Sequence, residues 1–205
     1  YYEHLRYCPE YGLAPTLPFN ATSCYKMFNL YDKVENLNFS RFRTGHVVDM
    51  CLMFENWTRV TNIDLSSFNT ENVSDFCAMF NGCNNVQFID VSSFKTPKVE
   101  NMSYMFTGCE KLLELSITGF SKENLQKAEG MFADCMSLTI INANYKFDLS
   151  MLSEDNISQP MFKDCVNLTG FSPEHTGIEM AKPKTEGGYF TPKGKKLENV
   201  SLMDM

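Results

Sequence analysis

Cysteine is the residue type in this chain that could do chemistry at a regular spacing. Four of the eight cysteines recur at intervals of 26, 26 and 30 residues. These four are Cys83, Cys109, Cys135 and Cys165. Thiols at a fixed spacing can form disulfide bridges or bind Zn²⁺, so both kinds of site compete with a third interpretation, buried free thiols.

The spacing favours buried free thiols. Parallel neighbours keep their Cβ atoms near the strand spacing of about 4.8 Å, beyond the ~3.8 Å that a disulfide prefers. No C-x₂-C pair supports zinc. Tyr31 and Trp57 precede the four cysteines at the same interval, which indicates an inward apolar position. Cys51 and Cys77 form a second column that we expect to be partly exposed. We predict no metal site and no cofactor.

The sequence does not group residues that could act together in catalysis. The three histidines lie at unrelated positions of the 26-residue interval: His4, His46 and His175. There is no glycine-rich phosphate loop and no G-x-S-x-G turn. Asp64 and Asp90 are 26 residues apart, but the same position continues as Ser116 and Asn142, so a polar ladder is the simpler interpretation. We therefore predict that the protein is not an enzyme.

The charge balance excludes two classes of partner. The formal net charge is −7, and the one basic cluster, Lys193 to Lys196, is short. Nucleic acids and anionic membrane surfaces both select clustered Lys and Arg, so neither is an expected partner. No run of 18 apolar residues is present, which predicts no transmembrane segment.

A repeat of 26 residues must position all of these side chains. The Met-Phe dipeptide occurs six times, with four intervals of 26 residues and a last one of 30. The six begin at Met27, Met53, Met79, Met105, Met131 and Met161. Self-similarity at a fixed period of this size is typical of stacked repeats that bury a common interior.

Each repeat divides into two halves with different periods. From Val47 to Trp57 the apolar steps are 3, 3, 1 and 3, which predicts a short helix. Around Ile63 and Leu65 the step is 2, which predicts a strand. Three threonines stand where a helix N-cap is expected: Thr44, Thr70 and Thr96. One column at the other end tolerates a left-handed backbone: Asn56, Gly82, Gly108, Asp134 and Asp164.

The predicted fold is an α/β solenoid, a right-handed leucine-rich-repeat superhelix with short parallel strands on one face and short helices on the other. Residues 1–19 form a lead-in, 20–171 an array of about six coils, and 172–205 a C-terminal cap and tail. The structural core is predicted to include Met53, Phe54, Met79, Phe80, Cys83, Met105, Phe106, Cys109, Met131, Phe132 and Cys135.

The motif carries a family resemblance. The stretch from Asn69-Thr70-Glu71-Asn72-Val73 through Met79-Phe80-Asn81-Gly82-Cys83 to Ile89-Asp90-Val91-Ser92-Ser93 resembles the BspA-like leucine-rich repeat, in its mycoplasma-lipoprotein-associated or bacterial surface-protein form. The resemblance covers about residues 20–193. It implies that Gly187-Gly188-Tyr189-Phe190-Thr191 belongs to a closing cap.

The resemblance also implies a location and a role. Such proteins are exported, stand on the bacterial cell surface or are secreted, and some members act as adhesins toward host proteins or other cells. It implies no enzymatic activity. We expect a signal or anchor segment, of lipoprotein type, to lie outside this chain.

The exposed strand face is the candidate partner-binding surface. Residues that flank the inward apolar pairs point outward, and Phe88 and Ile140 are the candidate apolar anchors among small polar groups. The predicted face comprises Asn38, Asn62, Asp64, Ser66, Phe88, Asp90, Ser92, Glu114, Ser116, Thr118, Ile140 and Asn142. The competing interpretation is a solvated polar sheet without a partner.

The sequence thus predicts a non-catalytic, adhesin-like module that binds a protein ligand. The alternatives are a structural spacer of a surface protein and a carbohydrate-binding surface protein. The face offers on the order of 300 Å², against about 800 Å² per partner in a standard interface, so strand-face binding alone would be weak.

Overall fold

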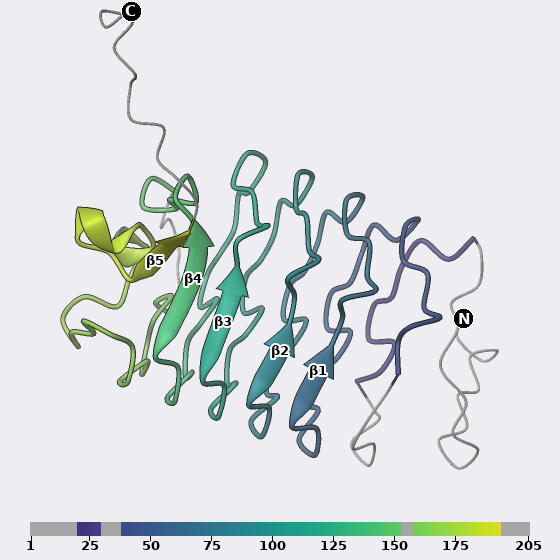
Figure 1. Ribbon diagram of the computed structural model, residues 1–205, viewed down its shortest axis with the longest axis horizontal. Coiled ribbons are helices and arrows are strands. Elements are labelled where there is room, and N and C mark those ends of the chain that lie inside the picture. Colours follow the sequence, from purple (N-terminus) through teal and green to yellow (C-terminus); the bar gives the residue numbers. More distant parts are fainter. Residues whose placement is uncertain (1–19, 30–37, 153–157, 194–205) are drawn as a thin grey trace, which may run out of the picture.

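The chain winds through successive coils that stack along the long axis of the molecule (Figure 1). The computed structural model describes residues 20–29, 38–152 and 158–193. Isolated parallel bridges join equivalent positions 26 residues apart, from Ser23 to Asp49, from there to Asp75, and on to Asn101 and Lys127. Each coil therefore corresponds to one repeat of the sequence.

In the described residues, five short strands lie along one long side of the stack (Figure 1). They are β1 (Asn62–Asp64), β2 (Phe88–Asp90), β3 (Glu114–Ile117), β4 (Ile140–Asn144) and β5 (Phe190–Lys193). All pairings are parallel, and they form two sheets, β1-β2 and β3-β4-β5. The register keeps equivalent residues together: Ile63 pairs with Ile89, and Leu115 pairs with Ile141.

The short helices predicted for the opposite side are absent from the described residues, where tight turns take their place. The helical elements there are two 3-10 helices near the C-terminus, η2 (Ile178–Met180) and η3 (Lys184–Glu186). The apolar step of 3 has another cause. Each four-residue turn, such as that closed by the Met53 amide on the Met50 carbonyl at 3.3 Å, brings the side chain three positions later back to the same inward side.

Hydrogen bonds to the next coil explain why turns replace helices. Alternate amides donate outside their own coil: Leu52 to the carbonyl of Cys77 at 2.9 Å and Phe54 to that of Met79 at 2.9 Å. In an α-helix those amides would donate four residues back within the same segment. The stack therefore gains a second parallel ladder at the cost of the helix.

Two positions on this turn side adopt a left-handed backbone in four successive coils, at Leu52/Asn56, Ala78/Gly82, Tyr104/Gly108 and Gly130/Asp134. The predicted left-handed column is confirmed: Asn56, Gly82, Gly108, Asp134 and Asp164 all have φ between 56° and 73°. A second column, four residues earlier, was not predicted: Lys26, Leu52, Ala78, Tyr104 and Gly130, with φ between 52° and 59°. A left-handed backbone costs a non-glycine residue about 1–2 kcal/mol, which the hydrogen bonds to the next coil offset.

The interior is a set of columns in which successive coils place the same or similar apolar side chains. Phenylalanine rings stack nearly parallel, with centroids 5.6 Å apart between Phe54 and Phe80 and 5.4 Å apart between Phe80 and Phe106. Offset stacking at this spacing is favourable for aromatic rings. All eleven residues predicted for the core are fully buried: Met53, Phe54, Met79, Phe80, Cys83, Met105, Phe106, Cys109, Met131, Phe132 and Cys135.

The three predicted N-cap threonines have a different role. The Thr70 hydroxyl donates to the carbonyl of Lys95 at 2.8 Å and accepts from the Lys95 amide at 2.9 Å. Thr44 makes the same two bonds to Asn69, and Thr96 to Ser121. No helix begins at these residues, so the hydroxyl caps nothing within its own coil. It joins one coil to the next and satisfies backbone groups that the bend between coils leaves unpaired.

The C-terminal segment packs across the last coils. Strand β5 pairs with β4, and Phe190 meets Phe162 and Phe132 at centroid distances of 6.1 and 6.2 Å. The buried Tyr189 hydroxyl donates to the carbonyl of His175 at 2.8 Å. Gly188 is required there, because an added Cβ would lie 2.1 Å from the carbonyl oxygen of Lys182.

Candidate binding surface

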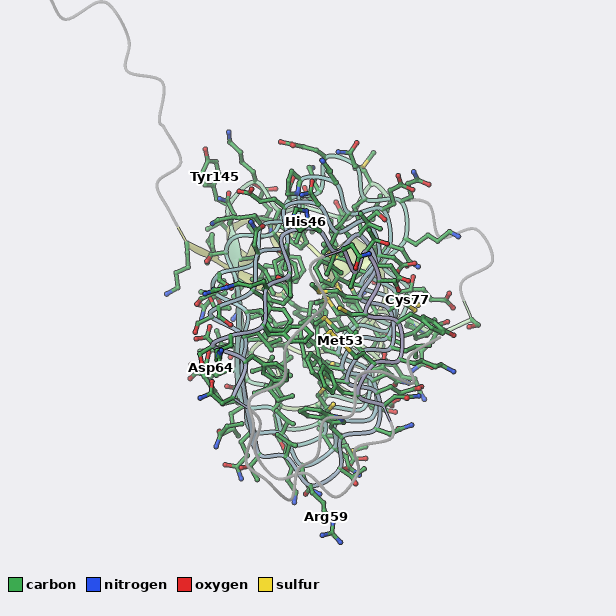
Figure 2. The ribbon with its side chains drawn as sticks, turned by 90° about the vertical axis from the view of Figure 1, so that its right-hand side faces the viewer. His46, Met53, Arg59, Asp64, Cys77 and Tyr145 are labelled. Carbon is green, nitrogen blue, oxygen red and sulfur yellow. The ribbon has the colours of Figure 1, made fainter. Side chains whose placement is uncertain are left out.

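The strand side and the turn side of the stack face opposite directions. Figure 2, which looks along the stack, shows Asp64 on one side, Cys77 on the other and Met53 between them. The interior between the two sides is filled by buried apolar side chains. A functional site in the described residues therefore has to lie on an outer surface.

Part of the polar strand face maintains the local fold. The Asp64 carboxylate accepts the Ser66 amide at 2.9 Å, and the Asp90 carboxylate accepts the Ser92 amide at 2.9 Å. Asn38 makes the same bond to Ser40. Such Asx turns follow β1 and β2, and Asn144 forms one after β4. The hydrogen bonds from Ser66 hold the pKa of Asp64 below its ordinary value. These carboxylates therefore have a structural role whether or not a partner binds.

Phe88 has no such structural role. It begins β2, its side chain is 54% exposed, and its paired neighbour in β1 is the polar Asn62. It lines a hollow of about 300 Å³ over the boundary between the two sheets, together with Asp90, Glu114, Ser116 and Asn142. The hollow offers an aromatic surface beside two carboxylates on an otherwise polar face.

Ile140, the second predicted anchor, is only half-buried and pairs in register with Glu114. Glu114 therefore stands between the positions of Phe88 and Ile140 along the column. Leu113 is the more exposed apolar residue, at 51%, and its amide donates to the Gln87 carbonyl at 3.3 Å, which places it beside β2. Leu113 was not among the residues predicted for this face. Its apolar side chain could have been noticed in the sequence, because the equivalent residues of the other coils are polar: Thr61, Gln87 and Thr139.

The structure brings most of the predicted face together along the strands. Exposed or half-buried positions are occupied by Asn38, Asn62, Asp64, Ser66, Phe88, Asp90, Ser92, Glu114, Ser116, Thr118, Ile140 and Asn142. Asn38 and Ser66 line a separate hollow of about 330 Å³ with Asp64. The apolar character is concentrated at Phe88 and Leu113, and Asp90 and Glu114 add negative charge beside them.

The inner cysteine column has a specific function in the fold. The Cys83 thiol donates to the carbonyl of Phe54 at 3.2 Å, and Cys109 to that of Phe80 at 3.3 Å. Trp57 occupies the same column, and its Nε1 donates to the Phe28 carbonyl at 2.6 Å. This column therefore selects a buried apolar side chain that also donates a hydrogen bond. The sequence-based prediction of a purely apolar position is corrected accordingly. Burial raises the pKa of Cys83 to about 12, so this thiol stays protonated.

Cys51 and Cys77 form a different kind of site on the turn side. Both are half-exposed, and a hydrogen bond joins their thiols. That bond lowers the pKa of Cys77 and raises the pKa of Cys51, because the proton kept on one sulfur stabilises the thiolate on the other. The Asp75 carboxylate accepts the Cys77 amide at 2.7 Å and lies beside the pair.

The candidate catalytic residues stay apart from one another. His46 and His175 are both exposed, near opposite ends of the described array, and His4 lies outside the described residues. Asp64 and Asp90 are paired in register, but each carboxylate accepts an amide from its own turn. Tyr31, predicted for the inner column, also lies outside the described residues.

Comparison with known proteins gives one match. The profile of a family described as "Mycoplasma protein of unknown function, DUF285" matches residues 22–145, which is more than half of the chain. No curated protein and no solved structure matches the chain. Among the described residues, no helix has the length and apolar character needed to span a bilayer.

Proposed function

We propose that this chain, which belongs to the Mycoplasma family of unknown function DUF285, is a non-catalytic module that binds a partner protein through its strand face. The proposal also covers the fold, location and role that the sequence predicts. The fold is a solenoid of BspA-like, leucine-rich type; the protein is exported to the bacterial cell surface; and its role is adhesin-like. The stacked coils with in-register parallel strands support it.

The single observation that carries the proposal is the exposed ring of Phe88. Burying a phenylalanine would contribute roughly 1.5–3 kcal/mol, yet here Phe88 is 54% exposed on a face where most of the other positions are polar. The fold does not select an aromatic residue at this position, because the equivalent residues are Asn62, Glu114 and Ile140. A hot-spot aromatic at the centre of an interface would account for it.

The surroundings of the ring define the chemistry of the partner. Asp90 and Glu114 line the same hollow as Phe88, so a Lys or Arg side chain could lay its apolar stem on the ring and its charge near a carboxylate. We therefore infer a basic segment in the partner protein. Such binding should weaken as salt is raised, because exposed charge pairs are screened over about 8–10 Å at physiological ionic strength.

A binding assay with two matched variants tests the proposal. Phe88→Asn introduces the residue that Asn62 supplies at the same position, so the coil should fold unchanged. We expect it to lower binding to immobilised host-matrix proteins by about tenfold or more. Val166→Asn is the control, since Val166 is 58% exposed in a turn outside the strands. It should bind as the parent does.

The two outcomes separate this function from the spacer. If Phe88→Asn and the parent bind equally well while both remain folded, the strand face is not the binding surface, and a structural spacer becomes the better interpretation. If only Phe88→Asn loses binding, a spacer does not explain the result. A loss in both variants would point to general apolar adhesion and would also contradict the proposal.

A further inference from the structure

A compact group of metal-binding side chains lies on the turn side, away from the strand face. The two sulfurs of Cys51 and Cys77 and a carboxylate oxygen of Asp75 lie within 4.8 Å of one another. Adjacent coils bring them together, since Leu52 donates to the Cys77 carbonyl at 2.9 Å and Asp49 bridges to Asp75. The backbone ladder thus fixes the positions of all three side chains.

The fold does not account for the cysteines at these positions. The equivalent residues in other coils are Tyr25, Ser103 and Glu129, none of which is a thiol. The inner thiols are buried and donate to phenylalanine carbonyls of the preceding coil, whereas Cys51 and Cys77 are half-exposed. Two adjacent thiols that packing does not require point to a ligand-binding role.

We propose that Cys51, Asp75 and Cys77 bind a thiophilic divalent cation, Zn²⁺, with water at the fourth position. Two thiolates and a carboxylate form a ligand set that suits zinc, and three protein ligands leave one tetrahedral position open. This proposal departs from the expectation of no metal site, which rested on sequence spacing: the two thiols are separated by a whole coil along the chain but are adjacent in space.

The separation of the coils favours a bridging metal over a disulfide. Two Zn–S bonds of about 2.3 Å at a near-tetrahedral angle place the sulfurs about 3.8 Å apart, which neighbouring coils near 4.8 Å accommodate. A disulfide needs sulfurs about 2.05 Å apart and Cβ atoms near 3.8 Å. The ladder on either side of the pair, including the bond from Met50 to the Asp75 carbonyl at 2.9 Å, resists that closer approach.

The carboxylate is already oriented for ligation. Asp75 accepts the Cys77 amide at 2.7 Å, which holds the group against the sulfurs while a carboxylate retains further acceptor capacity. Asp49 is fixed in the same way by the Cys51 amide at 2.9 Å and by the Ser23 hydroxyl at 2.9 Å. Outer hydrogen bonds of this kind orient metal ligands and strengthen binding.

Zinc titration of the full chain tests the site. The chain, carrying Cys8→Ser to remove a thiol outside the described residues, is stripped with a chelator under reducing conditions and titrated with Zn²⁺ alone. We expect one Zn²⁺ per chain by native mass spectrometry, and thiolate-to-metal absorption when Co²⁺ replaces it. Cys51→Ser, Cys77→Ser and Asp75→Asn should each weaken Zn²⁺ binding by at least about tenfold.

The controls keep misfolding apart from ligand loss. Asp75→Asn reproduces Asn101, which accepts the Ser103 amide at 3.0 Å in the same kind of turn, so the backbone should be retained. Ser103→Ala changes the same column one coil away and should leave zinc affinity unchanged. The proposal is wrong if the parent binds no Zn²⁺, if the cysteine variants bind as tightly as the parent, or if a Cys51–Cys77 disulfide forms and persists in the presence of Zn²⁺.

Discussion

The interior columns and the strand face follow opposite rules within the same coils. In the interior, equivalent positions of successive coils hold the same residue: Phe54, Phe80 and Phe106 are all phenylalanine, and each ring stacks on the ring of the next coil. On the strand face, the position of Phe88 is polar in the coil before it and acidic in the coil after it.

The difference teaches what the fold selects. An interior side chain is packed between its equivalents in the two neighbouring coils, so a change of size in one coil disturbs two others. A strand-face side chain that closes no turn, such as that of Phe88, meets solvent and can vary without loss of packing. Variation on that face is therefore available for function, and constancy in the interior reports only stability.

The largest expected effect contrasts two phenylalanines. Phe106→Ala removes a fully buried ring stacked between Phe80 and Phe132 at 5.4 and 5.8 Å, and should lower the free energy of unfolding by about 3–5 kcal/mol. Phe88→Ala should change it by no more than about 0.5 kcal/mol. Urea denaturation of both variants measures the contrast. Equal losses would show that the strand face is as tightly selected as the interior.

An intermediate effect is expected where a hydroxyl joins two coils. Thr70→Val keeps the side-chain volume but leaves the Lys95 amide and carbonyl without their partner, which should cost about 1–3 kcal/mol. Thr118→Val on the strand face should cost less than about 0.5 kcal/mol. Thermal unfolding compares the two. A larger loss at Thr118 would contradict the distinction between the two regions.

The smallest expected effect concerns pH. The pKa of Asp64 is lowered in the folded chain, so its carboxylate stabilises the fold above the ordinary value of 3.8, and the contribution is lost as pH falls through the folded pKa. Asp64→Asn should retain the turn, as Asn38 and Asn144 do, but abolish this titration. The advantage of the parent over the variant should shrink on acidification. A constant or growing advantage would overturn the assignment.

Several features could be predicted from the sequence because they repeat. The Met-Phe interval identifies residues that share one environment, and all six phenylalanines of these dipeptides are buried. Gly82 and Gly108 predicted a left-handed position, since glycine adopts it without steric cost. The outward position of Phe88 followed from the alternation around Ile89.

Other features could not be predicted, because the residues carry no signal of them. Leu52, Ala78 and Tyr104 disfavour a left-handed backbone, and hydrogen bonds to the next coil hold them in it. A step of 3 fits both a helix and a run of tight turns, so periodicity alone gave the wrong element. The approach of Cys51 to Cys77 depends on the register between coils, which emerges only when the coils are stacked.

The ladder that joins each coil to the next also determines how the molecule responds to tension. Bonds such as that from Phe80 to Met105 connect neighbours only, so a pull on the two ends detaches one coil while leaving the rest intact. Each detached coil releases 26 residues, which adds on the order of 90 Å of contour length. Under load the protein would lengthen in discrete steps and absorb mechanical work as an extensible tether.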